Sequence, residues 1–169
     1  MIVSMIVAVS DNGVIGQRGK IPWKLPKDLR RFKDLTKGKV VIMGRKTYDS
    51  LPRKPLPNRL NVVISKRKLS EFPDCLVFDS FKKALETLEK SGHEEVVVIG
   101  GESLYLEALE LATIAYITRI RVLVSGDAFF PISKIEEEWH MESQTADEPE
   151  QSNPESVFEI YTKSKPTPK

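Results

Sequence analysis

Short apolar segments alternate with amphipathic ones through the first two-thirds of the chain, and this alternation constrains the fold more than any other feature. Residues 2–9, 40–43 and 96–99 are apolar and rich in β-branched side chains, which is typical of strands buried on both faces. A segment with helical character follows each of them. The pattern predicts an α/β fold, in which helices cover both faces of a mostly parallel sheet.

The remaining apolar segments extend this sheet. Further strands are expected at 60–64, 75–78, 114–120, 139–143 and 157–162, and helices at 26–37, after Gly44, after Ser80 and after Gly101. The last two strands have no predicted helix between them, so we expect them to pair antiparallel at the edge of the sheet. We therefore expect one domain over residues 1–163, with a mostly parallel eight-stranded central sheet, an antiparallel C-terminal edge strand and about four flanking helices. The polar tail 164–169 is expected to fray.

Composition excludes several classes of protein. No apolar run in the 169 residues approaches the roughly 20 that a membrane helix requires, and the start reads as a strand rather than a signal peptide. Cys75 is the single cysteine, which rules out an internal disulfide and favours a reducing, cytoplasmic compartment. His93 and His140 stand far apart with no cysteine pair near them, so we expect no metal site. With a net charge of +2 and no self-complementary apolar stripe, we expect a monomer that binds neither nucleic acid nor membrane.

One helix carries an anomalous carboxylate. Leu25, Leu29 and Phe32 follow the spacing of a single apolar face in the helix 26–37, and Asp28 falls inside that face. An acid in a first helical turn is commonly exposed and stabilised by the helix dipole. The alternative is a carboxylate held in an apolar pocket, where it binds a ligand that offers N–H donors. Spacing alone leaves both interpretations open.

Three strand ends carry groups suited to phosphate, since glycine allows close approach and the N–H groups of a starting helix point at an anion. They are Gly44-Arg45-Lys46-Thr47, Ser65-Lys66-Arg67 and Gly100-Gly101. Each is a weak signal, because such segments are commonly plain turns or solvated corners. Together they suit a pyrophosphate with an additional monophosphate, as in NADPH, although the Gly-x-Gly-x-x-Gly fingerprint is absent. The nucleophile elbow and the Walker pattern are absent too, so covalent catalysis has no support.

A series of motifs resembles the dihydrofolate reductases of the chromosomal bacterial type and covers about residues 2 to 162. In the order of that family they are Val14-Ile15-Gly16, Ile21-Pro22-Trp23-Lys24-Leu25-Pro26-Lys27-Asp28-Leu29, Phe32-Lys33, Val41-Ile42-Met43-Gly44-Arg45-Lys46-Thr47, Leu56-Pro57-Asn58-Arg59, Val98-Ile99-Gly100-Gly101 and Gly126-Asp127. The resemblance implies the fold of that family. It also implies NADPH-dependent reduction of 7,8-dihydrofolate to 5,6,7,8-tetrahydrofolate by hydride transfer, which supplies one-carbon metabolism.

By the same resemblance, Asp28 accepts hydrogen bonds from the amino group and ring N–H of the pterin, as the only ionisable side chain in that pocket. Trp23 and Tyr105 join it in the catalytic set, and solvent water supplies the proton. The substrate-binding residues implied are Ile6, Val7, Ala8, Asp28, Leu29, Phe32, Lys33, Ser50, Leu51, Leu56, Arg59, Ile99, Tyr105 and Thr118. Within this set, Arg59 is expected to bind the glutamate α-carboxylate with two prongs.

On the cofactor side, the resemblance implies that Arg45, Ser65 and Lys66 read the 2′-phosphate, and that residues 16–23 form a loop closing over the nicotinamide. The full cofactor set is Ala8, Ile15, Gly16, Ile21, Gly44, Arg45, Lys46, Thr47, Ser65, Lys66, Arg67, Ile99, Gly100, Gly101, Glu102, Ser103, Leu104 and Tyr105. Three positions depart from common family patterns, namely Ile21, an extra Lys54, and Glu102, whose side chain we expect to turn away from the pyrophosphate.

Two alternatives remain. A pyrimidine reductase of the riboflavin pathway shares the fold, but its substrate carries a phosphate and the Asp28 motif is not its pattern. The other is a nucleic-acid-binding module that uses the basic residues Lys24, Lys27, Arg30, Arg31 and Lys33 of the Asp28 helix. A net charge near zero and the lack of an aromatic platform argue against it.

Overall fold

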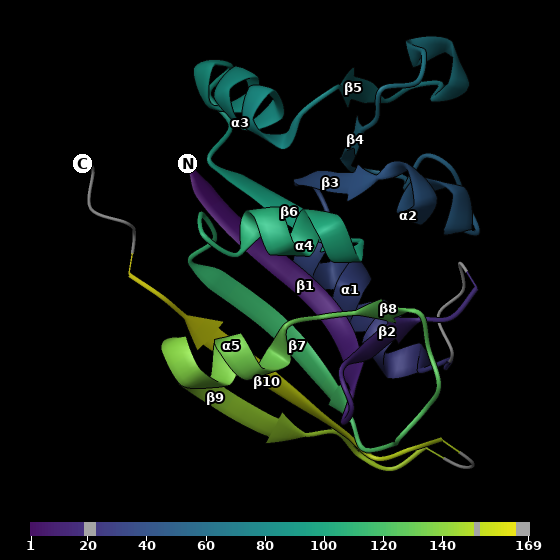
Figure 1. The fold of residues 1–169 in the computed structure, drawn as a ribbon, viewed down its shortest axis with the longest axis vertical. Coiled ribbons are helices and arrows are strands. Elements are labelled where there is room, and N and C mark those ends of the chain that lie inside the picture. The colour runs from purple at the N-terminus through teal and green to yellow at the C-terminus, as the bar shows by residue number, and fades with distance from the viewer. Residues whose placement is uncertain (19–22, 151–152, 165–169) are drawn as a thin grey trace.

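A computed structural model describes residues 1–18, 23–150 and 153–164, and the described part is organised around one eight-stranded sheet (Figure 1). The strand order is β5-β4-β3-β6-β1-β7-β10-β9. The strands are β1 (Ile2–Ser10), β3 (Val40–Gly44), β4 (Leu60–Ile64), β5 (Leu76–Phe78), β6 (Glu95–Gly100), β7 (Ile114–Ile120), β9 (His140–Ala146) and β10 (Ser156–Thr162). The helices are α1 (Pro26–Thr36), α2 (Arg45–Ser50), α3 (Phe81–Lys90), α4 (Glu102–Ala108) and α5 (Ile132–Glu138).

The pairing of these strands confirms the predicted sheet. β5, β4, β3, β6, β1 and β7 pair in parallel, whereas β10 pairs antiparallel with both β7 and β9. The antiparallel pairings therefore lie at the C-terminal edge, as expected from the lack of a helix between the last two strands.

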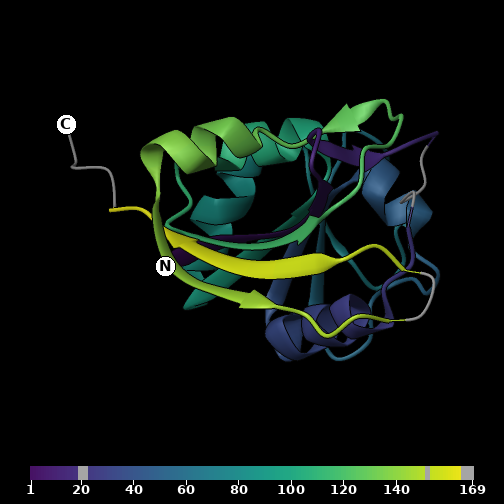
Figure 2. The same ribbon diagram turned by 90° about the horizontal axis from the view of Figure 1, so that it is seen from below.

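Apolar side chains cover both faces of the sheet, as the nearly continuous apolar strands predict. One face, with residues such as Met5, Ile42 and Val98, packs against α3, α4 and α5. The other face, with Val41, Met43 and their neighbours, packs against α1 and α2. Figure 2 shows the same arrangement, with α1 on one side of the sheet and α4 and α5 on the other. Alternate residues of one strand therefore serve opposite cores.

Three features differ from the prediction. Two very short strands, β2 (Val14–Gly16) and β8 (Ala128–Phe129), pair as a second sheet. A fifth helix, α5, was not expected, because Ile135 is its one buried residue and leaves no periodic stripe to detect. The helix predicted after Gly101 is α4, and it ends at Ala108 although the apolar spacing of Leu104 and Ala108 continues to Leu111. A short 3₁₀ turn, η1 (Leu69–Glu71), completes the described elements.

Two smaller expectations concern the cap of α3 and the C-terminal tail. Ser80 caps α3, because its hydroxyl accepts a hydrogen bond from the Lys83 backbone N–H at 3.2 Å. Of the tail that we expected to fray, residues 165–169 lie outside the described residues. Among the described helices, none has the length and apolar character to cross a bilayer.

Candidate active site

Asp28 lies in the first turn of α1 and faces β7, so the helix delivers its carboxylate to the sheet rather than to open solvent. The Thr118 hydroxyl donates a hydrogen bond of 2.6 Å to Asp28 Oδ1. The side chain retains 22% of its exposure, while Thr118 is 3% exposed. Among the described residues, no hydrogen bond reaches Asp28 Oδ2. One carboxylate oxygen is therefore anchored and the other is available to a ligand.

Two further charged side chains lie beside Asp28, which corrects the expectation that it is the only ionisable group in its pocket. Arg31 places Nη1 3.6 Å from Asp28 Oδ1 and 3.4 Å from Asp147 Oδ2. Its Nη2 donates a second hydrogen bond to Asp147 Oδ1. Asp147 follows β9 in the chain, and the Ser156 hydroxyl at the start of β10 donates to it at 2.7 Å. The carboxylate thus belongs to a charged cluster.

These surroundings raise the pKa of Asp28 above its ordinary value. Burial is the largest cause, because it disfavours the charged form. The hydrogen bond from Thr118 and the positive charge of Arg31 lower the pKa, and the negative charge of Asp147 raises it. Desolvation therefore outweighs the hydrogen bond and the nearby positive charge in setting the direction of the Asp28 pKa shift.

The rest of the α1 face is only partly packed, which modifies the predicted apolar stripe. Leu25 is buried and Phe32 packs against the core, but Leu29 is 60% exposed. A leucine in the middle of a core-facing stripe would ordinarily be buried. Leu29 beside Asp28 therefore presents apolar surface that a ligand can cover.

The three predicted phosphate-suited strand ends meet at one edge of the sheet. Gly44 pairs with Ile64 across β3 and β4, and Met43 pairs with Gly100 across β3 and β6. A Cβ on Gly100 would lie 3.4 Å from Thr47 Oγ1 and from the Tyr105 hydroxyl, and its φ of +126° disfavours any other residue. This edge is therefore a backbone cradle that side chains would fill.

Tyr105 connects the cradle to the Asp28 pocket. It lies on α4, and its hydroxyl donates a hydrogen bond of 2.7 Å to the Ile6 carbonyl. Burial, and secondly the negative charge of Asp28, raise the pKa of its phenol, which keeps it a neutral donor. Ala8 and Thr118 are paired neighbours across β1 and β7, which brings the predicted pterin and nicotinamide residues together.

Several predicted side chains are instead engaged within the protein. Arg45 pairs with Asp49 at 3.0 Å one turn along α2, and the Ser50 hydroxyl donates to the Thr47 carbonyl. Arg59 donates to the Pro57 carbonyl at 2.8 Å and to Thr36 Oγ1 at 3.1 Å. Each would have to exchange such a contact in order to bind a ligand.

Other predicted residues divide by burial. Val7 and Leu104 pack in the core on the α4 face, so only their backbone remains for a ligand. Leu51, Leu56 and Ile99 belong to the core on the α1 face. Exposed or half-exposed members are Ile15, Gly16, Trp23, Lys33, Lys46, Ser65, Lys66, Arg67, Gly101, Glu102 and Ser103, whereas Ile21 lies outside the described residues.

The first described residues of the predicted closing loop are held by the Gly126-Asp127 motif. The Asp127 N–H donates to the Gly16 carbonyl at 3.0 Å, and Asp127 Oδ2 accepts from the Arg18 N–H at 2.9 Å. The motif therefore anchors the start of the loop that begins at Gly16.

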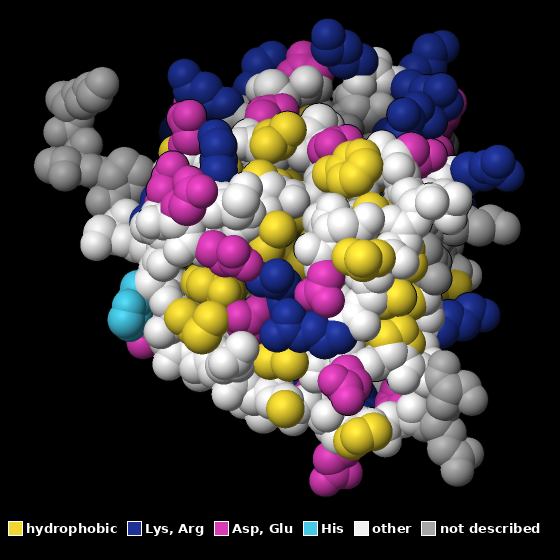
Figure 3. Space-filling model, turned by 60° about the horizontal axis from the view of Figure 1, so that its bottom comes forward, with side chains coloured by type: hydrophobic (Ala, Val, Ile, Leu, Met, Phe, Trp, Pro, Cys, Tyr) yellow, Lys and Arg dark blue, Asp and Glu magenta, His cyan; other side chains and the backbone are white. Residues whose placement is uncertain are grey.

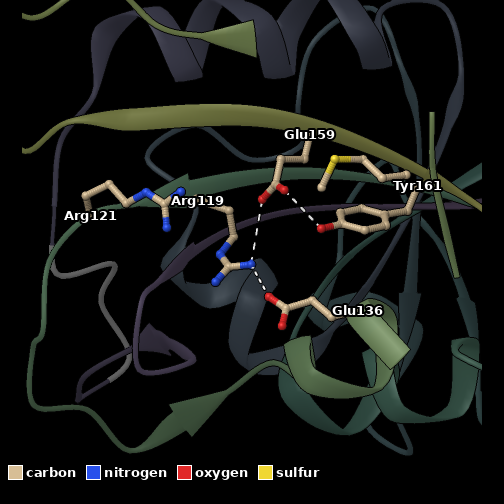
Figure 4. Close-up of a pocket in the computed structure, with 6 residues that line it drawn as sticks. Arg119, Arg121, Glu136, Glu159 and Tyr161 are labelled. Carbon is tan, nitrogen blue, oxygen red and sulfur yellow. Dashed lines mark hydrogen bonds and ion pairs between the residues drawn. The ribbon is translucent and has the colours of Figure 1, made fainter. Parts of the chain in front are cut away.

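A second cavity, of about 340 Å³, lies on the opposite face of the sheet beside α5 (Figure 4). Arg119 there lies between Glu136 and the buried Glu159, which also accepts a hydrogen bond of 2.9 Å from the Tyr161 hydroxyl. On the face drawn in Figure 3, acidic and basic side chains are interspersed. Because Arg119 points away from its neighbour Thr118 along β7, this cavity is separate from the Asp28 pocket.

Sequence reasoning missed Arg31 and Asp147 as members of the site. It placed Arg31 among outward-facing basic residues, whereas its guanidinium lies 4.2 Å over the Phe158 ring. No local pattern reveals this pair, because the two residues are 116 positions apart. Within the described ranges, no group of three or more His, Cys, Asp or Glu residues could hold a metal ion.

Comparison with known proteins gives concordant matches. The family model described as dihydrofolate reductase matches residues 2–163. The dihydrofolate reductase of Bacillus subtilis is 40% identical over 162 residues, covering 95% of this chain and 94% of that protein. That of Buchnera aphidicola is 38% identical over 164 residues, covering 96% and 100%. A solved Enterococcus faecalis dihydrofolate reductase, complexed with NADP(H) and RAB-propyl, superimposes with a TM-score of 0.86 at 29% identity and covers 95% of each chain. This chain therefore belongs to the dihydrofolate reductase family.

Proposed function

We propose that this protein reduces 7,8-dihydrofolate to tetrahydrofolate with NADPH, and that Asp28 anchors the pterin. The observation that carries the proposal is the Asp28 carboxylate, with Oδ1 fixed by Thr118 and Oδ2 left without a hydrogen bond among the described residues. A carboxylate accepts hydrogen bonds only, so it suits a ring that presents an amino group and an N–H on one edge. Such charge-assisted bonds are worth about 1.5–3 kcal/mol each.

The surroundings of Asp28 suit a flat, mostly apolar ring. Leu29 and Phe32 on α1 flank the carboxylate on its own helix, and Leu29 loses solvent when a ring covers it. Ile6 and Ala8 on β1 form the floor, and the Ile6 carbonyl is already held by Tyr105. The pocket thus fixes the orientation of a pterin through few polar contacts and excludes water around it.

The reaction needs a hydride at the imine carbon of the pterin and a proton at the neighbouring nitrogen. NADPH, when bound, supplies the hydride. The cradle of Gly44, Gly100 and Gly101 leaves room for its pyrophosphate, and Thr47 offers a hydroxyl there. Tyr105, a neutral buried donor, keeps the floor of the pocket in place, while Asp28 sets the local polarity and water delivers the proton.

Two basic groups would select the ends of the two ligands. Arg45 forms an ion pair with Asp49, one turn further along α2. Because Asp49 is exposed, the Arg45 guanidinium can exchange it for a 2′-phosphate. Arg59 lies 5.9 Å over the Phe32 ring, beside the pterin side of α1, where it would bind the glutamate carboxylate. Ser65, Lys66 and Arg67 at the end of β4 would add to the phosphate site.

The decisive assay follows the loss of NADPH absorbance with and without dihydrofolate. We expect oxidation only when dihydrofolate is present, and none with the phosphorylated pyrimidine of the riboflavin pathway.

Arg45→Ala should raise the KM for NADPH about tenfold or more and leave that for NADH nearly unchanged, because NADH lacks the 2′-phosphate. Lys39→Ala removes the ion pair with Glu95, at the opposite, amino ends of β3 and β6, and should change neither KM. Equal losses for both cofactors in Arg45→Ala would reject Arg45 as the phosphate reader.

We further propose that the protein acts as a cytoplasmic monomer over residues 1–163 and binds no nucleic acid. The nucleic-acid alternative required a free basic face on α1. Of the five cations proposed for it, Lys24 lies before α1, and two others are paired with acids, Arg31 with Asp147 and Lys27 with Glu148, which weakens that interpretation. Salt-dependent binding of RNA, together with no binding of NADPH, would overturn the proposal that the protein binds no nucleic acid.

A further inference from the structure

The guanidinium of Arg31 lies between two carboxylates that come from opposite ends of the chain. It approaches Asp28 from one turn further along α1 and binds Asp147 from the β9–β10 connection with both of its terminal nitrogens. The Arg31 and Asp147 side chains are 21% and 9% exposed, so solvent screens this contact less than a surface pair.

Thr118 joins the pair to Asp28 by a chain of hydrogen bonds. Arg31 Nη1 lies 3.3 Å from Thr118 Oγ1, which itself lies 2.6 Å from Asp28 Oδ1. A hydroxyl has one proton, and the charged carboxylate takes it, so Thr118 accepts from Arg31 and donates to Asp28. The charge of Arg31 therefore reaches Asp28 both directly and through a polarised hydroxyl.

Neither partner is free to swing away. The Arg31 guanidinium stacks 4.2 Å over the Phe158 ring, and Phe158 in turn stacks on Tyr116 with an interplanar angle of 5°. Asp147 receives the Ser156 hydroxyl at 2.7 Å, and its backbone N–H donates to the Ser156 carbonyl at 3.0 Å. The arrangement is a preorganised cluster rather than a mobile surface contact.

We propose that Arg31 and Asp147 are positioning residues for the reaction, an opposed charge pair that acts on the substrate through Asp28 and Thr118. The proposal rests on the proposed function, in which Asp28 anchors the pterin. Arg31 favours the ionised carboxylate, and Asp147 offsets that effect by sharing the guanidinium and by repelling Asp28. The directions found for the pKa of Asp28, lowered by Arg31 and raised by Asp147, agree with this geometry.

Other charged groups near Asp28 are weaker candidates for the same effect. Tyr105 belongs to α4 on the opposite face of the sheet, and burial keeps its phenol neutral. Lys27, Glu148 and Glu150 line the rim of the small pocket that also includes Asp28 and Asp147. Glu148 is 93% exposed and its contact with Lys27 is 3.8 Å long, so solvent screens both.

The test uses Arg31→Gln, Asp147→Asn and the double variant. In the ligand-free protein, carboxyl NMR follows the titration of Asp28, with Asp28→Asn identifying its signal. In single turnovers with saturating NADPH and dihydrofolate, the pH midpoint of hydride transfer is measured. Asp147→Asn should lower both the Asp28 pKa and the midpoint, Arg31→Gln should raise both, and the double variant should return toward the wild type. We expect midpoint shifts of about half a pH unit or more.

Two controls separate charge from packing. Arg31→Lys keeps the charge and should keep the midpoint, whereas a purely structural loss would appear in every Arg31 variant. Glu148→Gln removes the charge of an exposed acid that pairs with Lys27 of α1, and should move neither the Asp28 pKa nor the midpoint.

The outcomes are distinct. Single variants that shift the Asp28 pKa in the same direction, or not at all, would overturn the proposal independently of activity. Opposed pKa shifts with an unmoved hydride-transfer midpoint would overturn the positioning role. An absence of dihydrofolate-dependent oxidation in the unaltered protein would instead refute the proposed function and leave the NMR result standing.

Discussion

Gly126 is the residue whose replacement the structure penalises most clearly. A Cβ at this position would lie 2.2 Å from Val14 Cγ1, 3.2 Å from Val14 Cγ2 and 2.6 Å from the Gly16 carbonyl oxygen. Rotating Val14 could relieve the first two contacts, but the third is with backbone. Gly126→Ala must therefore separate the Gly126-Asp127 motif from β2.

The cost can be worked from these contacts. Overpacking of a single methyl group against fixed neighbours typically costs about 1–3 kcal/mol. The separation also stretches the hydrogen bonds from the Asp127 N–H to Gly16 and from the Arg18 N–H to Asp127, worth about 0.5–1.5 kcal/mol each. Because the two hydrogen bonds lengthen rather than break, only part of their energy is lost, and we expect Gly126→Ala to lower the free energy of unfolding by about 2–4 kcal/mol.

Urea denaturation and NADPH kinetics measure the two consequences. Because Gly16 begins the predicted closing loop, the KM for NADPH should rise severalfold along with the loss of stability. Gly38→Ala is the matched control. Gly38 has a φ of +74°, and a Cβ there would meet no neighbouring atom of the described residues within 4 Å, so the replacement should cost about 1–2 kcal/mol through backbone strain and leave the KM unchanged. Adding Val14→Ala to Gly126→Ala should cost less than the sum of the two single variants, because it removes the two contacts with the buried Val14 side chain and leaves only the carbonyl contact. A Gly126→Ala protein as stable as the wild type would refute the close approach.

Two further predictions concern buried acids. Burial raises the pKa of Asp28, so the charged carboxylate destabilises the ligand-free protein at neutral pH, and Asp28→Asn should increase its stability there. Urea denaturation midpoints should show that this gain vanishes below about pH 4, where Asp28 is protonated in both the folded and the unfolded state. Glu159→Gln removes one of the two acids that pair with Arg119 and should lower the free energy of unfolding. We expect a loss of only about 1–3 kcal/mol, because Arg119 keeps Glu136 as a partner. Burial and then Glu159 raise the pKa of Tyr161, so ultraviolet titration of Glu159→Gln should show one tyrosine ionising at lower pH, and an unchanged titration would contradict the coupling.

The parallel sheet could be predicted because its strands carry apolar side chains on both faces, which a short sequence window reveals. Helix α5 could not, since Ile135 is its one buried residue, Ile132 is only partly buried, and the other five residues are exposed and polar. The β2–β8 pair could not either, because three- and two-residue strands are too short for a period.

The site residues also divide into those that a local sequence pattern reveals and those that only the fold brings together. Asp28 stood out because it interrupts a local stripe, and the glycines stood out because they follow strands directly. The ion pair of Arg31 with Asp147 depends on a contact between residues far apart in sequence, so only the folded chain reveals it. The exposure of Leu29 was hidden for a related reason, since periodicity shows which face is apolar but not where the protein leaves that face open.

The central claim is that Asp28 anchors the pterin, and the most direct measurement is the rate of dihydrofolate-dependent NADPH oxidation by Asp28→Asn as a function of pH. Loss of a charged acceptor for two N–H groups predicts a fall of about 100-fold or more at neutral pH. Part of the rate should return at acidic pH, where the substrate is more easily protonated. Asp34→Asn, an exposed acid on the same helix, should behave as the wild type. Unchanged activity of Asp28→Asn at neutral pH would contradict the account.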